Sequence, residues 1–428
     1  MIEKIEKYSF LSIFIIMIIF NFLAYFNKDI GFIHNLPLLL SFYLLIISVP
    51  ILFIIFKSKN KVVFKNYNIL LFIYLITVMI STIFSEIPII SFVGKEGRNE
   101  GLLTILFYAL IFIFMQKIIK KDNIIKYINY ILIFGIIQTT FAILQSYFNI
   151  FPYFHNMAYA FCGNPNMFGL LISTLSILSI SLYLFYKPNK FYLFTGIYSY
   201  IGLLLSESSG PFFTYCLILF IMFIYNVIKK VSVLNFLKVL VILVILFPII
   251  QFSNFDINRK RGNLLFYNSP QIYSDIISIS KDAISKFDKR DVVISSTLSN
   301  SPSVSNGRFY IWKKSFKLGL DNIYNGIGPD MLEVYQYMDN GSFQVFDKSH
   351  NHYLEIFVSS GIFSLISYVL FLVVVIYKGI KSNNVLSKCL LFSILTYSIA
   401  ISMNISTPLV AVYYYTLLGF IISLERKN

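Results

Sequence analysis

Residues 233–252 read VLNFLKVLVILVILFPIIQF, and Lys238 is the only charged residue among them. A transmembrane helix needs about 20 consecutive, mostly apolar residues, so this stretch is long enough to cross a bilayer. Eleven further stretches of the same kind lie on either side of it. The predicted spans are 8–26, 36–56, 67–85, 102–119, 124–148, 165–186, 191–206, 210–228, 233–252, 351–377, 386–403 and 408–424.

The composition of the chain supports this reading. Of its 428 residues, 57% are hydrophobic and only 13% are charged, whereas soluble domains average about 25% charged residues. We therefore predict an all-α fold, a polytopic transmembrane helix bundle of about 12 spans. The only long break divides one integrated membrane domain into residues 1–252 with spans 1–9, a large loop at 253–350, and residues 351–428 with spans 10–12.

The basic residues indicate how the chain is oriented. With the N-terminus in the cytoplasm, the predicted inner segments hold 20 Lys and Arg residues, the short outer loops hold three, and the long loop holds the other 12. Short cytoplasmic loops of membrane proteins are enriched in Lys and Arg, and long loops do not follow this rule. The pattern predicts cytoplasmic termini and an extracytoplasmic loop at 253–350. It also accounts for the net charge of +15 without a nucleic-acid partner.

The long loop is predicted to contain two amphipathic helices. The first covers residues 281–291, and a Ser- and Asn-rich connection at 295–307 follows it. In the second, Asn306 is the expected N-cap. One face of the second helix carries residues three or four positions apart, as a helix on the membrane surface requires: Phe309, Trp312, Phe316 and Leu320.

Two polar motifs precede predicted spans on the outer side. The first, GKEGRNEG at 94–101, has glycines that permit sharp turns and offers Lys95, Arg98 and Glu100 beside the membrane. Its alternative is a loop whose charges pair with each other. The second, GNPN at 163–166, contains Asn164 and Asn166, and its alternative is a plain helix start.

Two more motifs belong to the long loop. Asn-Gly-Arg at 306–308 places Arg308 near a helix N-terminus together with Trp312, where phosphate oxygens are favoured partners; the alternative is a surface Arg with an interfacial Trp. Ser-His-Asn-His at 349–352 offers His350 and His352 as proton acceptors near neutral pH, with Asn351 between them. The alternative there is a polar helix cap.

The chemistry that these motifs allow is restricted. Two histidines are too few for a recognisable zinc site, and the chain has no nucleotide-binding loop or nucleophile elbow. We therefore expect no metal and no cofactor. A reaction on the outer face then needs an activated substrate, and a lipid-linked pyrophosphate sugar fits this need. Its phosphates would meet the basic groups, and its tail would lie between helices.

Taken in order, the motifs resemble those of the O-antigen ligase and polymerase superfamily of bacterial membrane proteins. The resemblance runs from the third span to the last. It is carried by GKEGRNEG (94–101), FCGNPNMFG (161–169), GRFYIWKKS (307–315), YNGIGPD (324–330) and SHNHYLEIFVSSGIFSLISY (349–368).

This resemblance implies a glycosyltransferase of the bacterial inner membrane. Members move a glycan from an undecaprenyl-pyrophosphate-linked donor to a lipid, glycan or protein acceptor on the outer face, without a metal. The matching positions make His350 the base, and Arg308 and Arg98 the residues that stabilise the pyrophosphate. Substrate contacts are expected from the other motif residues: Lys95, Glu100, Asn164, Asn166, Trp312, Asn351 and His352.

One position departs from the family pattern. The family often has Ser-Arg-Gly at the start of a middle span, whereas this chain has Ser209 where the Arg is usual. This departure leaves three possibilities: an altered donor, compensation by Lys95 or Arg98, or an inactive homologue. A non-catalytic membrane component of envelope assembly therefore stays an alternative to the transferase, and a flippase or transporter of lipid-linked glycans is a second alternative. Membrane lipids are partners under every alternative.

Overall fold

The computed structural model is a helix bundle. It describes residues 48–49, 51–52, 55, 65–95, 98–118, 120–148, 157–253, 304–335, 337–339, 342–344 and 346–426. The predicted span 8–26, most of 36–56, and the predicted amphipathic helix at 281–291 lie outside these residues.

The described helices follow the predicted spans closely. In chain order they are α3 (Asn66–Ile83), α4 (Pro88–Val93), α5 (Leu102–Ile118), α6 (Lys121–Phe148), α7 (Pro165–Ser181) continued by the π-helical turn η1 (Leu182–Tyr186), α8 (Lys190–Leu205), α9 (Ser209–Lys229), a helix at Val233–Ser253, α11 (Val304–Asp321), α12 (His352–Lys381), α13 (Val385–Ala400) with the 3-10 turn η3 (Ile401–Met403), and α14 (Pro408–Leu424).

Seven of the described helices are long and apolar enough to cross a membrane, and α5, α8 and α14 are apolar but slightly shorter. Each of these ten coincides with one of the last ten predicted spans, within a few residues. They make the chain a multi-pass membrane protein. The total of 12 spans and the orientation of the termini stay predictions.

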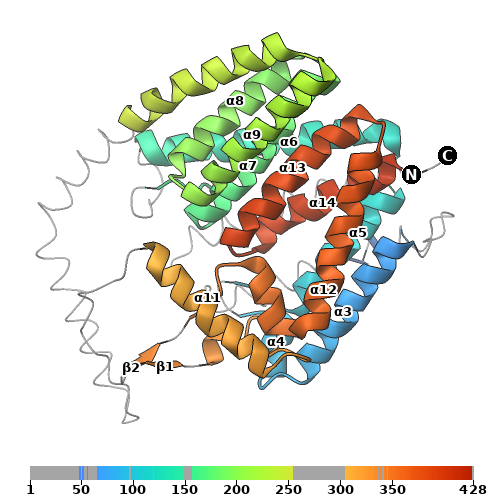
Figure 1. The fold of residues 1–428 in the computed structure, drawn as a ribbon, viewed down its shortest axis with the longest axis vertical. Coiled ribbons are helices and arrows are strands. Elements are labelled where there is room, and N and C mark those ends of the chain that lie inside the picture. Colours follow the sequence, from blue (N-terminus) through green and yellow to red (C-terminus); the bar gives the residue numbers. More distant parts are fainter. Residues whose placement is uncertain are drawn as a thin grey trace, which may run out of the picture.

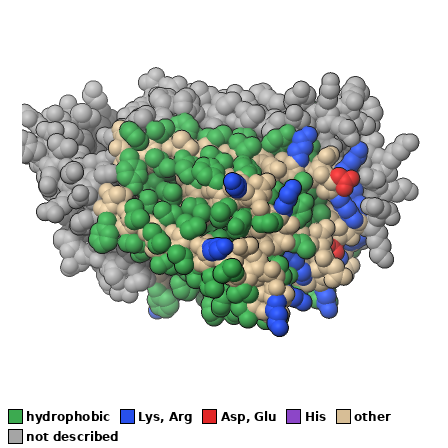
Figure 2. Space-filling model, turned by 90° about the horizontal axis from the view of Figure 1, so that it is seen from above, with side chains coloured by type: hydrophobic (Ala, Val, Ile, Leu, Met, Phe, Trp, Pro, Cys, Tyr) green, Lys and Arg blue, Asp and Glu red, His purple; other side chains and the backbone are tan. Residues whose placement is uncertain are grey.

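The bundle is organised around α7, α13 and α14, whose residues are mostly buried. Helix α7 packs on α8 and α13, α14 packs on α5, and α12 packs on α3. Figure 2 shows one outer face of the bundle, where hydrophobic side chains form a broad area and most visible Lys and Arg side chains lie toward one end. Apolar surface of this extent suits contact with lipid rather than water.

The loop elements gather at one end of the molecule (Figure 1). There α4, α11 and α12 share a small apolar cluster of their own, which includes Ile90, Leu318 and Val358. The 3-10 turn η2 (Leu332–Val334) and the antiparallel strands β1 (Tyr337–Asp339) and β2 (Ser342–Gln344) follow α11. The fold class is all-α, as predicted, and this short hairpin is an addition within the loop.

Helix α11 confirms the second predicted amphipathic helix but corrects its cap. The helix begins at Val304, so Asn306 lies inside its first turn instead of capping it. Arg308 therefore lies one turn inside the helix. Phe309, Phe316 and Leu320 are exposed at 69%, 53% and 48%, whereas Trp312 of the same predicted face is half-buried.

A break in α12 positions the turn that follows α11. Gly361 has φ 80° and ψ 178° inside α12, which frees backbone groups on either side of the break. The turn at 323–328 satisfies them: the N–H groups of Ile327 and Gly328 donate to the carbonyls of Val358 and Ser359 at 3.0 and 2.8 Å. The turn is thereby fixed to α12, and its last residues are carried toward α3 and α4.

Gly361 provides a test of this break. A side chain there needs a positive φ that non-glycine residues rarely adopt, and its Cβ would overlap the carbonyl oxygen of Tyr324. We expect Gly361→Ala to destabilise the purified protein by more than about 1–3 kcal/mol, seen as a lower melting temperature in detergent. The control Gly210→Ala, whose Cβ would meet only ordinary contacts at 3.7 Å, should melt like the wild type. Equal melting of both variants would contradict the role of the break.

Candidate active site

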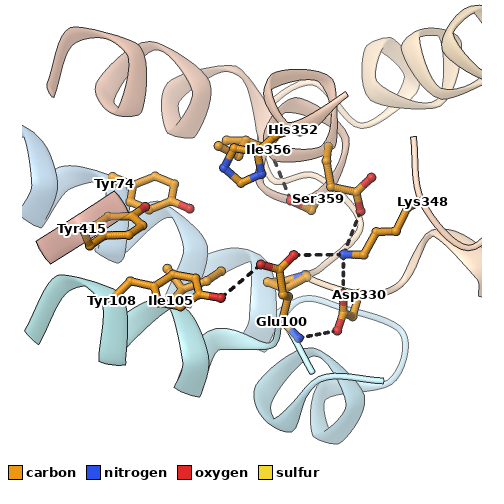
Figure 3. A pocket seen from close by; sticks show the side chains of 12 residues that line it. Tyr74, Glu100, Ile105, Tyr108, Asp330, Lys348, His352, Ile356, Ser359 and Tyr415 are labelled. Atoms are coloured by element: carbon orange, nitrogen blue, oxygen red, sulfur yellow. Dashed lines mark hydrogen bonds and ion pairs between the residues drawn. The ribbon is translucent and has the colours of Figure 1, made fainter. Parts of the chain in front are cut away.

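A buried lysine joins three distant segments of the chain (Figure 3). Lys348 is only 2% exposed. Its ammonium forms an ion pair with Asp330 and lies 3.4 Å from a Glu355 oxygen and 3.7 Å from a Glu100 oxygen. Burial alone would lower the pKa of Lys348, but the three carboxylates raise it well above its usual value. The lysine is therefore charged at all physiological pH values.

Asp330 binds the 94–101 loop to this cluster through hydrogen bonds. Its Oδ2 accepts the backbone N–H groups of Lys95 at 3.0 Å and Glu100 at 2.8 Å. Gly94 has φ 98°, and a Cβ there would overlap the backbone of Asn99, so the loop can close only with glycine at this position. The 94–101 loop thus pairs with the segment after α11 and not within itself.

Glu100 is a buried carboxylate of the cluster. Burial raises its pKa to about 6, although Lys348 opposes this shift. The Tyr108 hydroxyl donates a hydrogen bond to its other oxygen at 3.2 Å. Glu100 was expected to bind substrate, but the structure places it inside this buried cluster.

Glu355 fixes the segment that contains His350. Its Oε2 accepts both the backbone N–H and the hydroxyl of Ser349 at 2.8 Å. On the other side, the Asn351 side chain caps α12 by accepting the N–H groups of Tyr353 and Leu354 at 3.1 and 3.2 Å. His350 is held between these two anchors with φ 52°.

Backbone strain is concentrated in this region. Six non-glycine residues have positive φ within the described part of the chain, and Asn99, Asp330 and His350 all belong to the segments that meet at Lys348. Such conformations cost about 1–3 kcal/mol each and persist where surrounding contacts enforce them. The cluster provides those contacts, and they fix the backbone conformation of the loop around His350.

The structure brings His350, Arg98 and Arg308 into one neighbourhood. Burial lowers the pKa of His350, and the nearby guanidinium groups of Arg308 and Arg98 lower it further, against the carboxylates of Asp347 and Glu355. The imidazole is therefore neutral at pH 7 and can accept a proton.

The two arginines differ in their partners. Arg98 pairs with Asp347, its Nε donating to Oδ2 at 2.8 Å, and this contact lowers the pKa of the carboxyl against the effect of burial. Arg308 donates to the Met403 carbonyl at 3.3 Å, and no carboxylate pairs with it among the described residues. Arg308 thus keeps most of its charge-assisted donor capacity for an anion.

Other predicted site residues have structural contacts. Lys95 pairs with Glu333 at the surface. Asn164 caps α7 by accepting the N–H of Asn166 at 2.8 Å, which agrees with the helix-start alternative. The Asn166 side chain accepts the hydroxyl of Ser208 at 2.7 Å and so ties the start of α7 to the start of α9. The indole N–H of Trp312, one turn after Arg308, is buried and has no hydrogen-bond partner among the residues that the structure describes.

His352 lies apart from His350, in the wall of a small inner cavity shown in Figure 3. The cavity also borders Tyr74, Tyr108 and the Lys348 cluster, and its volume is about 30 Å³. A water molecule needs about 10–15 Å³ measured in this way, so the cavity holds waters but no sugar. His352 therefore faces the interior of the protein.

The comparison with family models agrees with this geometry. Residues 192–369 match the model described as O-antigen ligase. This match supports the predicted resemblance to the O-antigen ligase and polymerase superfamily. The match includes Ser209, Arg308, Lys348 and His350, whereas Arg98 precedes it. No curated protein matches the chain.

The O-antigen ligase match supports a glycosyltransferase-like function in surface glycan biosynthesis, and together with the apolar helices it supports a multi-pass protein of the inner membrane. A lipid-linked glycan donor and a glycan acceptor follow in general terms. The resemblance was predicted from the motif order, and the match over residues 192–369 supports it.

Sequence reasoning missed Lys348, Asp330 and Asp347. A signal was present: Asp330 ends the YNGIGPD motif, and Lys348 immediately precedes SHNH. Carboxylates next to apolar spans need a counter-charge when they are buried. The sequence alone did not show which cation would supply it.

Lys348→Met tests the cluster. Removing one partner of a buried ion pair costs about 3–5 kcal/mol because the other charges stay buried, so the variant should melt well below the wild type at pH 7.5. Without Lys348 the pKa of Glu100 rises above its wild-type value of about 6, so Glu100 takes up a proton at higher pH in the variant, and the deficit should shrink as the pH falls from 7.5 toward 6. The control Lys95→Met breaks a partly exposed pair and should cost less than about 1 kcal/mol. A deficit independent of pH would contradict the electrostatic explanation.

Proposed function

We propose that the protein transfers a glycan from a lipid-linked pyrophosphate donor to an acceptor hydroxyl on the outer face of the cytoplasmic membrane. The observation that carries this proposal is the position of His350, which is held between two anchored residues and has the guanidinium of Arg308 among its charged neighbours. A base next to a cation matches the needs of a displacement in which a proton leaves the nucleophile and negative charge builds on the leaving group.

The proposed reaction is a direct displacement. His350 takes the proton of the acceptor hydroxyl as that oxygen attacks the anomeric carbon of the donor sugar. The bond between the anomeric carbon and the pyrophosphate oxygen breaks, and the lipid pyrophosphate leaves with the bonding electrons. Arg308 stabilises the charge on the leaving oxygens. The proton on His350 is then released to water.

Arg98 is proposed to act beside Arg308 on the donor phosphates. Its pairing with Asp347 also holds its guanidinium near His350. Donor phosphates would compete with Asp347 for this guanidinium, so Arg308 is the stronger candidate for the main contact. Arg308 and Arg98 would compensate for Ser209, which stands where the family often has an arginine.

The acceptor and the donor lipid are proposed at the level of chemical class. An undecaprenyl chain suits the bacterial inner membrane, and a lipid, a glycan repeat or a protein could supply the hydroxyl. In a deletion strain, loss of all attached repeats would indicate a ligase. Retention of a single attached repeat, with loss of the series of longer glycan chains, would indicate a polymerase.

His350→Ala should abolish glycan transfer while the membrane content and melting temperature of the protein stay at wild-type levels. The measurement is transfer of a labelled glycan from the lipid donor in reconstituted vesicles. Undiminished transfer would refute the role of His350. Lipid translocation without bond formation in the same vesicles would favour the flippase alternative.

Arg308→Gln should reduce transfer about 100-fold or more, the usual cost of one donor to a developing anion. The matched control is Lys317→Gln, which removes the same charge from an exposed position on α11. If the two variants lose transfer equally, general attraction of anions explains the effect, and Arg308 has no specific contact with the leaving group.

The pH profile gives a separate test. Because the pKa of His350 lies below its usual value, transfer should fall as the pH is lowered, and the midpoint of this acidic limb should lie below the usual histidine pKa of about 6.5. Asp347→Asn removes a carboxylate that raises the pKa of His350, so the fall in transfer at acidic pH should occur at still lower pH in this variant. A fall that occurs at higher pH than in the wild type would contradict the assignment of His350 as the base.

A further inference from the structure

Four helices that pack on one another, α3, α5, α12 and α14, bring basic residues together near the C-terminus, which Figure 1 marks on the side away from α4 and α11. Arg426, just after α14, donates from Nη1 to the carbonyl of Lys117 near the end of α5 at 3.0 Å. Lys378, in the last turn of α12, places its ammonium 5.6 Å from the ring centroid of Tyr67 at the start of α3. These contacts gather three cations, Lys117, Lys378 and Arg426, around Tyr67, in what we call the basic niche.

The cations of the basic niche are close enough to affect one another. Arg426 is an electrostatic neighbour of both Lys117 and Tyr67. Lys117 is only 9% exposed, and its ammonium donates to the carbonyl of Ile55 at 2.9 Å. Like charges repel, and the repulsion grows as water is removed from around them. The niche therefore has a positive potential that favours an anion.

The described residues supply little negative charge to balance this potential. Every ion pair between described side chains belongs to the loop region around Lys348, on the other side of the molecule. Neither Lys378 nor Arg426 pairs with a described carboxylate. The first turn of α3 holds no acidic residue, and its N-cap, Lys65, adds a positive charge where the helix dipole is already positive.

Helix capping explains only part of this arrangement. Cations commonly bind the last carbonyls of a helix, and Arg426 does so through Nη1. Its Nη2 is buried and has no hydrogen-bond partner among the described residues, which is unfavourable for a charged donor. The side chain as a whole is only half-buried, so an anion can approach it. The ammonium of Lys378 contacts the Tyr67 ring and makes no hydrogen bond to a described residue. Both cations thus keep donor groups that capping does not use.

Apolar surface continues from the niche along α3 and α12. Four residues within two turns of the niche are 41–55% exposed: Ile69 and Ile73 of α3, and Val373 and Ile380 of α12. Both helices are long and apolar enough to cross a membrane, so these side chains contact lipid tails. A ligand that suits both surfaces has an anionic head at the niche and hydrocarbon chains beside it. Basic pockets between transmembrane helices bind the head groups of anionic lipids in this way.

We propose that the basic niche binds the phosphate of an anionic phospholipid through Lys378 and Arg426, with the acyl chains against α3 and α12. The niche lies on the predicted cytoplasmic side, so the lipid comes from the inner leaflet. The inference does not rest on the proposed function, because the niche and the proposed active site lie on opposite sides. The lipid would hold together the ends of α5 and α12, which begin beside Glu100 and at Glu355 of the Lys348 cluster.

The test measures the affinity of the full-length protein for phosphatidylglycerol in neutral detergent, from the rise in melting temperature during a lipid titration. One Lys or Arg near a membrane surface changes the affinity for anionic lipid about fivefold. We therefore expect Lys378→Gln to bind about fivefold more weakly, and Lys378→Gln combined with Arg426→Gln about 25-fold more weakly. The control Lys229→Gln removes the same charge from an exposed position at the end of α9 and should bind like the wild type. Phosphatidylcholine should produce no rise.

Inorganic phosphate separates a lipid from a soluble anion. At millimolar concentration it should leave the melting temperature of the wild type unchanged, and a rise equal to that with phosphatidylglycerol would overturn the proposal. An equal response of the wild type and Lys378→Gln to phosphatidylglycerol would overturn it as well. If the double variant does not fold, Lys378→Gln carries the test alone, because its loss breaks no hydrogen bond to a described residue. Phosphatidylglycerol with a photoreactive acyl chain should label α3 and α12, and labelling confined to other helices would contradict the site.

Discussion

The structure depends on the burial of one positive charge. A lysine removed from water is tolerated only when anions surround it, and Lys348 obtains them from Glu100, Asp330 and Glu355, which lie in three different segments of the chain. Satisfying this one charge therefore brings the early loop, the turn after α11 and the start of α12 together. The segment that carries His350 follows Lys348 directly and is held in place by the same contacts.

The buried cluster has a structural role. The cavity beside it has room only for water, so its charged groups hold the loops in place and cannot contact a sugar. Arg98 is paired within the protein, whereas Arg308 is held only by a carbonyl and has charge available for an anion.

The sequence predicted the features that depend on local pattern. Each apolar run in the described chain became a helix because length and hydropathy decide this in a membrane. The motif order predicted the family and brought attention to His350 and Arg308. The break at Gly361, the short hairpin and the Lys348 cluster were not predictable, since they depend on contacts between residues far apart in the chain. Asn306 was a reasonable cap by residue type, but the helix begins earlier.

The central claim is that the early loop and the segment before His350 meet on the outer face of the membrane. Arg98→Cys combined with Asp347→Cys, in a protein whose exposed Cys216 is replaced by Ser, tests proximity and sidedness together. The two side chains are in direct contact in the structure. A short, membrane-impermeant bifunctional thiol reagent added to intact cells should link the two positions, as detected by mass spectrometry. A link that forms only after the membrane is permeabilised, or no link at all, would contradict the account.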